Sequence, residues 1–150
     1  MAEGVLPTGK LPPEMLENLF GYCQSDDPRV VVGAKVGEDA AVLDFGERFL
    51  VAKSDPVTFA GDRIGWYAVH VNANDVATRG AEPRWMLVTL LLPGPTATYD
   101  MARAIMEQMA TACRDLGVTL VGGHTEVTYG LDRPIVVGHM LGEVARDRLV

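Results

Sequence analysis

Three aspartates stand at positions where they could bind a metal ion through oxygen. Asp39 lies at the entrance to an apolar segment, and Asp55 lies just before Pro56, whose missing N–H predicts the end of a strand. Asp75 follows Asn72 by three residues on a predicted helix, so both side chains project from one helix face. Mg²⁺ prefers carboxylate oxygens, which makes the three aspartates a candidate magnesium site. The alternative is that each aspartate caps a helix or a turn.

The segment from residue 37 to residue 62 is acidic and needs a compensating positive charge. Its carboxylates are Glu38, Asp39, Asp44, Glu47, Asp55 and Asp62, and its basic residues are Arg48 and Lys53. A carboxylate on the buried side of a helix, as expected for Asp75, also needs a partner. A bound cation or an ion pair would satisfy both requirements.

A glycine pair follows the apolar segment 118–121. Gly122 and Gly123 would let the backbone approach a phosphate closely, but the GxxxxGK[ST] and GxGxxG signatures are both missing. His124, which comes next, could bind a metal, contact a phosphate or hydrogen-bond the backbone in a turn. The chain also lacks a G-x-S-x-G turn and an electropositive setting for either cysteine, which argues against a nucleophilic triad.

Composition limits the classes of function. The 150 residues include 13 Lys and Arg against 20 Asp and Glu, a net charge of −7, and 48% are hydrophobic. This is typical of one globular domain with a packed core. The absence of a basic cluster argues against a nucleic-acid partner. The sequence has no apolar stretch of signal-peptide or membrane-spanning length, so we expect a cytoplasmic protein without a membrane partner. Cys23 and Cys113 are expected to be buried packing residues.

Hydrophobic patterning predicts elements in the order β-β-β-α-β-α-β-β, after a short helix opened by Pro12 and Pro13. The predicted strands are residues 30–32, 40–43, 49–52, 85–92, 118–121 and 135–144, and the run 85–92 is expected to be buried on both faces. One helix is predicted from an Asp62 N-cap to residue 79, and another over 98–116 with Gly117 as its stop. This order predicts an α+β fold, a mixed sheet with helices on one face.

Four segments, read together, resemble a known family. They are VGEDAAV at 36–42, SDP at 54–56, VNANDVATRGAEP at 71–83 and GGHT at 122–125. In this order they resemble the amino-terminal domain of the aminoimidazole-ribonucleotide synthetase (PurM)-like superfamily, which includes HypE, thiamine-monophosphate kinase and selenophosphate synthetase. The opening GKLPPE at 9–14 is most similar to HypE-related, AIR synthase-related proteins. The resemblance implies a PurM-like α+β domain over residues 1–144, with residues 145–150 beginning a linker to an absent carboxy-terminal domain.

The resemblance also implies a function. It predicts an ATP-dependent enzyme of the phosphoryl-transfer or dehydratase type, in which Mg²⁺ orients the triphosphate. The metal ligands carried over from the family are Asp39, Ser54, Asp55 and Asp75. The residues expected to bind the nucleotide are Lys53, Asn72, Gly122, Gly123, His124 and Thr125. The family's amino-terminal domains pair so that their sheets form a barrel, which predicts a homodimer.

Some features depart from the family pattern. His124 stands where the kinase and HypE branches have Asp, and Lys53 replaces a small hydroxyl residue. The carboxy-terminal cysteine motif of HypE is absent, so the isolated domain is expected to be incomplete for turnover. Its acceptor, a small molecule or a protein-bound thiocarboxy or carbamoyl group, is left open. The alternative function is a non-catalytic dimerising assembly module that retains the fold, for example in metalloenzyme maturation.

Overall fold

A six-stranded mixed sheet forms the centre of the molecule, with strand order β1-β2-β3-β6-β4-β5. The structure, a computed structural model, describes residues 4–23, 25–59 and 61–150. β4 and β5 are parallel, and the other neighbouring strands are antiparallel. The strands are β1 (Val30–Val32), β2 (Ala41–Asp44), β3 (Arg48–Val57), β4 (Glu82–Pro93), β5 (Thr119–Thr128) and β6 (Ile135–Ala145). The predicted α+β class and order of elements are confirmed.

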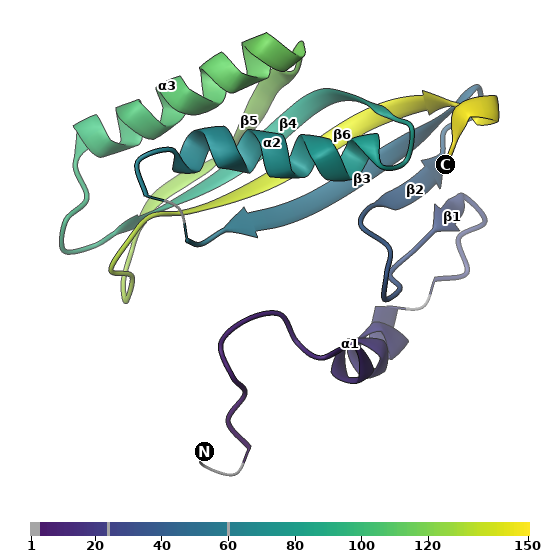
Figure 1. Ribbon diagram of the computed structural model, residues 1–150, viewed down its shortest axis with the longest axis horizontal. Helices are drawn as coiled ribbons and strands as arrows, with labels where there is room; N and C mark the ends of the chain where they lie inside the picture. Colours follow the sequence, from purple (N-terminus) through teal and green to yellow (C-terminus); the bar gives the residue numbers. More distant parts are fainter. Residues whose placement is uncertain (1–3, 24, 60) are drawn as a thin grey trace.

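Two long helices, α2 (Ile64–Ala77) and α3 (Tyr99–Leu116), cover one face of this sheet (Figure 1). A short helix, α1 (Pro13–Phe20), opens with proline and has no buried residue. It lies apart from the sheet, followed by the 3₁₀ turn η1 (Gly21–Cys23) (Figure 1). The second 3₁₀ turn, η2 (Arg146–Arg148), follows β6. The core therefore lies between one sheet face and α2 and α3.

At the ends of α3, the predicted Gly117 stop is confirmed and Thr98 acts as the N-cap. The Thr98 side chain accepts a hydrogen bond from the Met101 N–H, and Gly117 ends the helix with a φ of 69°. The predicted Asp62 N-cap of α2 is wrong, because the helix begins one residue later and no side chain of its own caps it. Gln108 of α3 takes this role: its Oε1 accepts from the Gly65 N–H at 3.0 Å, and its Nε2 donates to the Asp62 carbonyl at 2.7 Å.

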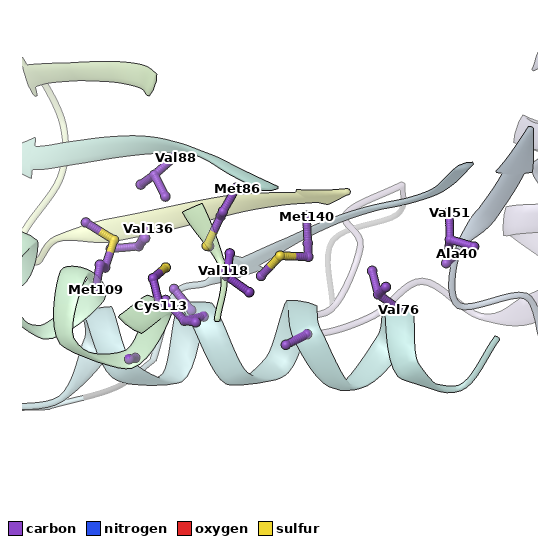
Figure 2. Close-up of a cluster of buried hydrophobic side chains, with 14 of the residues drawn as sticks. Ala40, Val51, Val76, Met86, Val88, Met109, Cys113, Val118, Val136 and Met140 are labelled. Atoms are coloured by element: carbon purple, nitrogen blue, oxygen red, sulfur yellow. The ribbon is translucent and has the colours of Figure 1, made fainter. Parts of the chain in front are cut away.

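The core is built from alternate residues of the strands. In β6 every second residue from Val136 to Val144 is buried beneath the helices, and in β4 Met86, Val88 and Leu90 are buried in the same way. Figure 2 shows Met86, Val88 and Val136 of the sheet in one cluster with Met109 and Cys113 of α3. Burial of this apolar surface supplies the main force that holds the helices on the sheet.

Strand lengths and faces correct several predictions. β3 continues beyond Pro56, since Pro56 pairs with Val137 and a single missing N–H does not end a ladder that β6 supports. The glycine pair lies inside β5 and forms no turn, because β4 extends the parallel pairing as far as Thr128. β4 is buried on one face only, and Trp85 and Leu87 on the other face are each 36% exposed.

Individual side chains also differ from expectation. Cys113 is buried, and burial raises the pKa of its thiol, whereas Cys23 is exposed in η1. Met106 and Leu116 of α3 are exposed, because only a narrow stripe of this helix is buried, formed by Ile105, Met109, Ala112 and Cys113. Residue Ala145 belongs to β6, and Arg146 binds Asp44 with two N–O distances of 2.9 Å.

In the ranges that the structure describes, no helix has the length and apolar character needed to cross a bilayer.

Candidate functional site

A lysine between two aspartates marks the site where β3 faces α2. The Lys53 Nζ lies 2.7 Å from Asp75 Oδ2 and 4.0 Å from Asp55 Oδ1. Lys53 and Asp55 are two residues apart on β3, so their side chains lie on the same face of the sheet, the face that α2 covers. The Lys53 side chain is only 14% exposed, against 30% for Asp55 and 23% for Asp75. The fold thus brings two of the predicted ligands and Lys53 together.

The Asn72 side chain fixes the position of Asp55 relative to α2. Its side chain is completely buried, one turn before Asp75 on α2. The Asn72 Oδ1 accepts a hydrogen bond from the Asp55 N–H at 2.9 Å, while Nδ2 donates to the Asp55 carbonyl at 3.3 Å and to the Ala68 carbonyl at 2.8 Å. The amide therefore binds the backbone of Asp55 as a neighbouring strand would.

The sheet leaves room for that amide at one glycine. A Cβ placed on Gly138 would overlap the Asn72 side chain and stand 2.8 Å from the Met86 Cε. Gly138 lies directly opposite Asp55 in the β3–β6 ladder. The glycine, the buried amide and the site aspartate therefore form one packed unit, and this unit sets the position of β3 relative to α2.

Asp39 lies in the loop before β2 and is exposed. Its neighbour Glu38 forms an ion pair with Arg79, which lies just beyond the last turn of α2. β2 pairs with β3 from Ala41 opposite Ala52 onward. The loop is therefore attached to the end of α2 that carries Asp75, close to the Asp55 end of β3. Its prediction as a metal ligand stays a prediction.

Ser54 points away from the two aspartates. It lies opposite His139 of β6, on the sheet face that α2 and α3 leave uncovered. The uncovered face also carries His124 of β5, because His124 pairs with Thr89 of β4. Thr89 lies between the buried residues Val88 and Leu90 and therefore points to the opposite face of the sheet. Within one chain, His124 is thus separated from the Lys53 cluster by the sheet itself and by two strands, β6 and β4.

Side-chain hydrogen bonds link His124, Glu126 and Thr128 along this part of β5. His124 Nε2 lies 2.9 Å from Glu126 Oε2, and the Thr128 hydroxyl donates to Glu126 Oε1 at 2.7 Å. The hydrogen bond from Thr128, followed by that from His124, lowers the pKa of the Glu126 carboxyl. Thr125, the next residue after His124, is exposed as well.

The two glycines of β5 have an evident structural role. Gly122 and Gly123 have φ angles of 150° and 147°, which disfavour other residues. They directly follow Val121, the residue skipped where the pairing of β4 with β5 shifts register. A Cβ on Gly123 would overlap the Val88 carbonyl oxygen. The close approach that the glycines allow is to β4, and their predicted contact with a nucleotide stays a prediction.

The donor chemistry of the cluster suits a hard divalent cation. Asp55 and Asp75 offer carboxylate oxygens, and Lys53 shows that a positive charge is held between them. Over residues 4–23, 25–59 and 61–150, no group of three or more His, Cys, Asp or Glu side chains converges as a ready metal cage. Mg²⁺ needs no such cage, since it is usually held by one or two carboxylates together with substrate phosphates and water.

Sequence reasoning missed three interactions of this region. The pairing of Glu38 with Arg79 and the capping of α2 by Gln108 join segments that are distant in the chain. Lys53 was expected to contact the nucleotide, and its ion pair with Asp75 was not foreseen. The only signal available was the local excess of carboxylates, which required a cation without indicating which one.

Comparison with known proteins places the chain in a family. Residues 37–144 match the family model "AIR synthase related protein, N-terminal domain". Selenide, water dikinase of Salmonella typhi is 30% identical over 132 residues, which cover 81% of this chain and 38% of that protein.

Two solved structures are also similar. The hydrogenase maturation protein HypE in complex with ATP has 28% identity and a TM-score of 0.63, covering 83% of this chain and 37% of that one. The HypE-HypF complex has 26% identity and a TM-score of 0.69, covering 87% of this chain and 42% of that one. The chain therefore spans well under half the length of these relatives. With the family model matched over most of its length, it belongs to the AIR synthase related protein family, through that family's N-terminal domain.

Proposed function

We propose that this domain binds ATP together with Mg²⁺ and serves an ATP-dependent phosphoryl-transfer or dehydratase reaction. The observation that carries the proposal is the convergence of Asp55 and Asp75 on one cation, the Lys53 ammonium. The solved complex of HypE with ATP supports ATP as the ligand. Mg²⁺ would supply charge neutralisation of the transferred phosphoryl group.

The chain's own residues have distinct tasks in this proposal. Asp55 and Asp75 hold the metal ion, and Asn72 keeps Asp55 in place through its backbone. Asp39 adds a third carboxylate from the loop that the Glu38–Arg79 ion pair secures. The acceptor group is a small molecule or a protein-bound thiocarboxy or carbamoyl group.

Calorimetry tests the metal-dependent binding of ATP. We expect ATP to bind in the presence of Mg²⁺ and not in excess chelator. Asp55→Asn and Asp75→Asn should each weaken Mg-ATP binding at least tenfold, because each removes an anionic ligand. Asp115→Asn, an exposed position on α3, is the matched control and should bind like the parent. Equal affinity in chelator, or unchanged affinity in both site variants, would contradict the proposal.

We also propose that the domain forms a homodimer through the uncovered sheet face. That face carries partly exposed apolar residues of β4, among them Trp85 and Leu87. A second copy would bury them, as a symmetric interface does. Light scattering should report about twice the chain mass of 16.2 kDa, and Leu87→Asp should give a monomer, whereas Tyr129→Asp in the exposed β5–β6 loop should not.

The same two measurements separate the alternative function. A dimer that binds no Mg-ATP would favour a dimerising assembly module without turnover. A monomeric parent protein at tens of micromolar would contradict the proposed interface. The partly exposed apolar residues on the uncovered sheet face are the reason to test this alternative.

A further inference from the structure

We propose that Lys53 is an internal counter-cation that makes the site selective for Mg²⁺ arriving together with a nucleotide. In the free protein its ammonium occupies the place between Asp55 and Asp75 and excludes free divalent cations. When the metal–nucleotide complex binds, the ammonium passes from the carboxylates to the phosphates. The inference rests on the proposed function, which it extends by assigning the order and the coupling of binding.

The Lys53 ammonium already lies where a metal ion would bind. Lys53 extends from the covered face of β3 and is the least exposed of the three charged side chains, at 14%. Its direct ion pair is with Asp75 Oδ2 at 2.7 Å, and Asp55 Oδ1 is at the limit of an ion pair. A metal ion held between these two carboxylates would occupy the space in which the ammonium lies. The lysine and the metal therefore compete.

The charge of the Lys53 ammonium opposes the binding of a free divalent cation. Two carboxylates and one ammonium leave a net charge of −1, so a free divalent cation would have to enter beside a retained positive charge. A unit charge a few ångströms from a divalent ion opposes its binding by more than tenfold, even at the dielectric constant of water. Without the lysine, Asp55 and Asp75 alone would carry −2, which matches a divalent cation.

The Lys53 side chain can exchange one anionic partner for another. A lysine has a flexible four-carbon stem and three N–H donors, so its ammonium can rotate from a carboxylate to a neighbouring anion. A polyphosphate brings that anion with the metal. Asp55 remains in place during the exchange, because its backbone is held by Asn72 and does not depend on Lys53. Metal and nucleotide therefore bind with positive coupling.

A calorimetric titration with Mn²⁺ alone tests whether Lys53 excludes free divalent cations. We expect Lys53→Met to bind Mn²⁺ at least tenfold more tightly than the parent. Lys10→Met, which removes an exposed lysine, is the matched control and should leave Mn²⁺ affinity unchanged. The double variant Lys53→Met with Asp75→Asn should lose the gain, which would locate the new affinity at this site.

A second titration with Mg-ATP tests the transfer to phosphate. Lys53→Met should bind Mg-ATP at least fivefold more weakly than the parent, so that the two affinities change in opposite directions. Lys53→Arg keeps the charge and should exclude free Mn²⁺ as the parent does. Circular dichroism checks the fold of each variant. If Lys53→Met is unfolded in chelator, recovery of its spectrum with Mn²⁺ supports the inference, and failure to recover contradicts it.

The outcomes separate the inference from the proposed function. Failure of the parent to bind ATP with Mg²⁺ contradicts the proposed function, while a tenfold gain of Lys53→Met for Mn²⁺ would still support the counter-cation role. Binding of Mg-ATP by the parent, with equal Mn²⁺ affinity in the parent and in folded Lys53→Met, overturns the inference alone.

Discussion

Replacement of Asn72 by Ala tests the link between the core and the candidate site. The wild-type amide makes three hydrogen bonds, of which two are to the backbone of Asp55 and one is to the Ala68 carbonyl. Each contributes about 1 kcal/mol net, which sums to about 3 kcal/mol for the three bonds. We therefore expect Asn72→Ala to lower the free energy of unfolding by about 3 kcal/mol. That is a large part of the 5–15 kcal/mol typical of a domain.

Urea denaturation followed by circular dichroism measures this loss. With a slope of about 1–3 kcal/mol per molar urea, the midpoint should fall by about 1–3 M. Asn74→Ala is the matched control, because Asn74 lies two residues away on α2 but is exposed. Its free energy of unfolding should change by less than about 0.5 kcal/mol.

A second variant separates the donor and acceptor roles of the amide. Asn72→Asp has nearly the same shape and can still accept from the Asp55 N–H. It loses the donations to the Asp55 and Ala68 carbonyls and faces both with a carboxylate. It should be at least as destabilised as Asn72→Ala. If both variants unfold within about 0.5 kcal/mol of the Asn74→Ala control, the reasoning is refuted.

Three further outcomes are expected from the same structure. Gly138→Ala should lower the free energy of unfolding by about 1–3 kcal/mol in urea denaturation, because the added Cβ overlaps the buried amide. A thiol reagent should label Cys23 in the folded protein and Cys113 only after denaturant is added, since Cys113 is buried and its thiol pKa is raised. The pKa of Asp44 is lowered below its usual 3.8 by the backbone N–H two residues later and by Arg146. Its stabilising effect is therefore present above that value and lost as the pH falls through the lower folded-state pKa; Asp44→Asn should flatten this part of the pH–stability curve.

Local patterns were sufficient where one segment contains its own determinants. The helix α3 is such a case, since its apolar spacing, its Thr98 cap and its Gly117 stop all lie within or next to the segment. The same holds for β6, whose alternating burial follows directly from the period of a strand. Predictions failed where a distant element supplied the missing interaction. Gln108 of α3 replaced the expected Asp62 cap, and β6 carried β3 beyond Pro56.

The residue types of the candidate site were determined by the sequence, since the order of its acidic segments resembles a family and carboxylates favour Mg²⁺. Which of these residues meet was decided by the tertiary structure alone. Asp55 and Asp75 converge because Asn72 binds α2 to β3 over Gly138, whereas Ser54, adjacent in sequence, points to the opposite face. Successive side chains of a strand point to opposite faces, so the side on which a helix packs decides which of the candidate residues meet. Which face of the sheet the helices cover depends on the apolar surface that all the strands bury together. No short segment of the sequence contains that information.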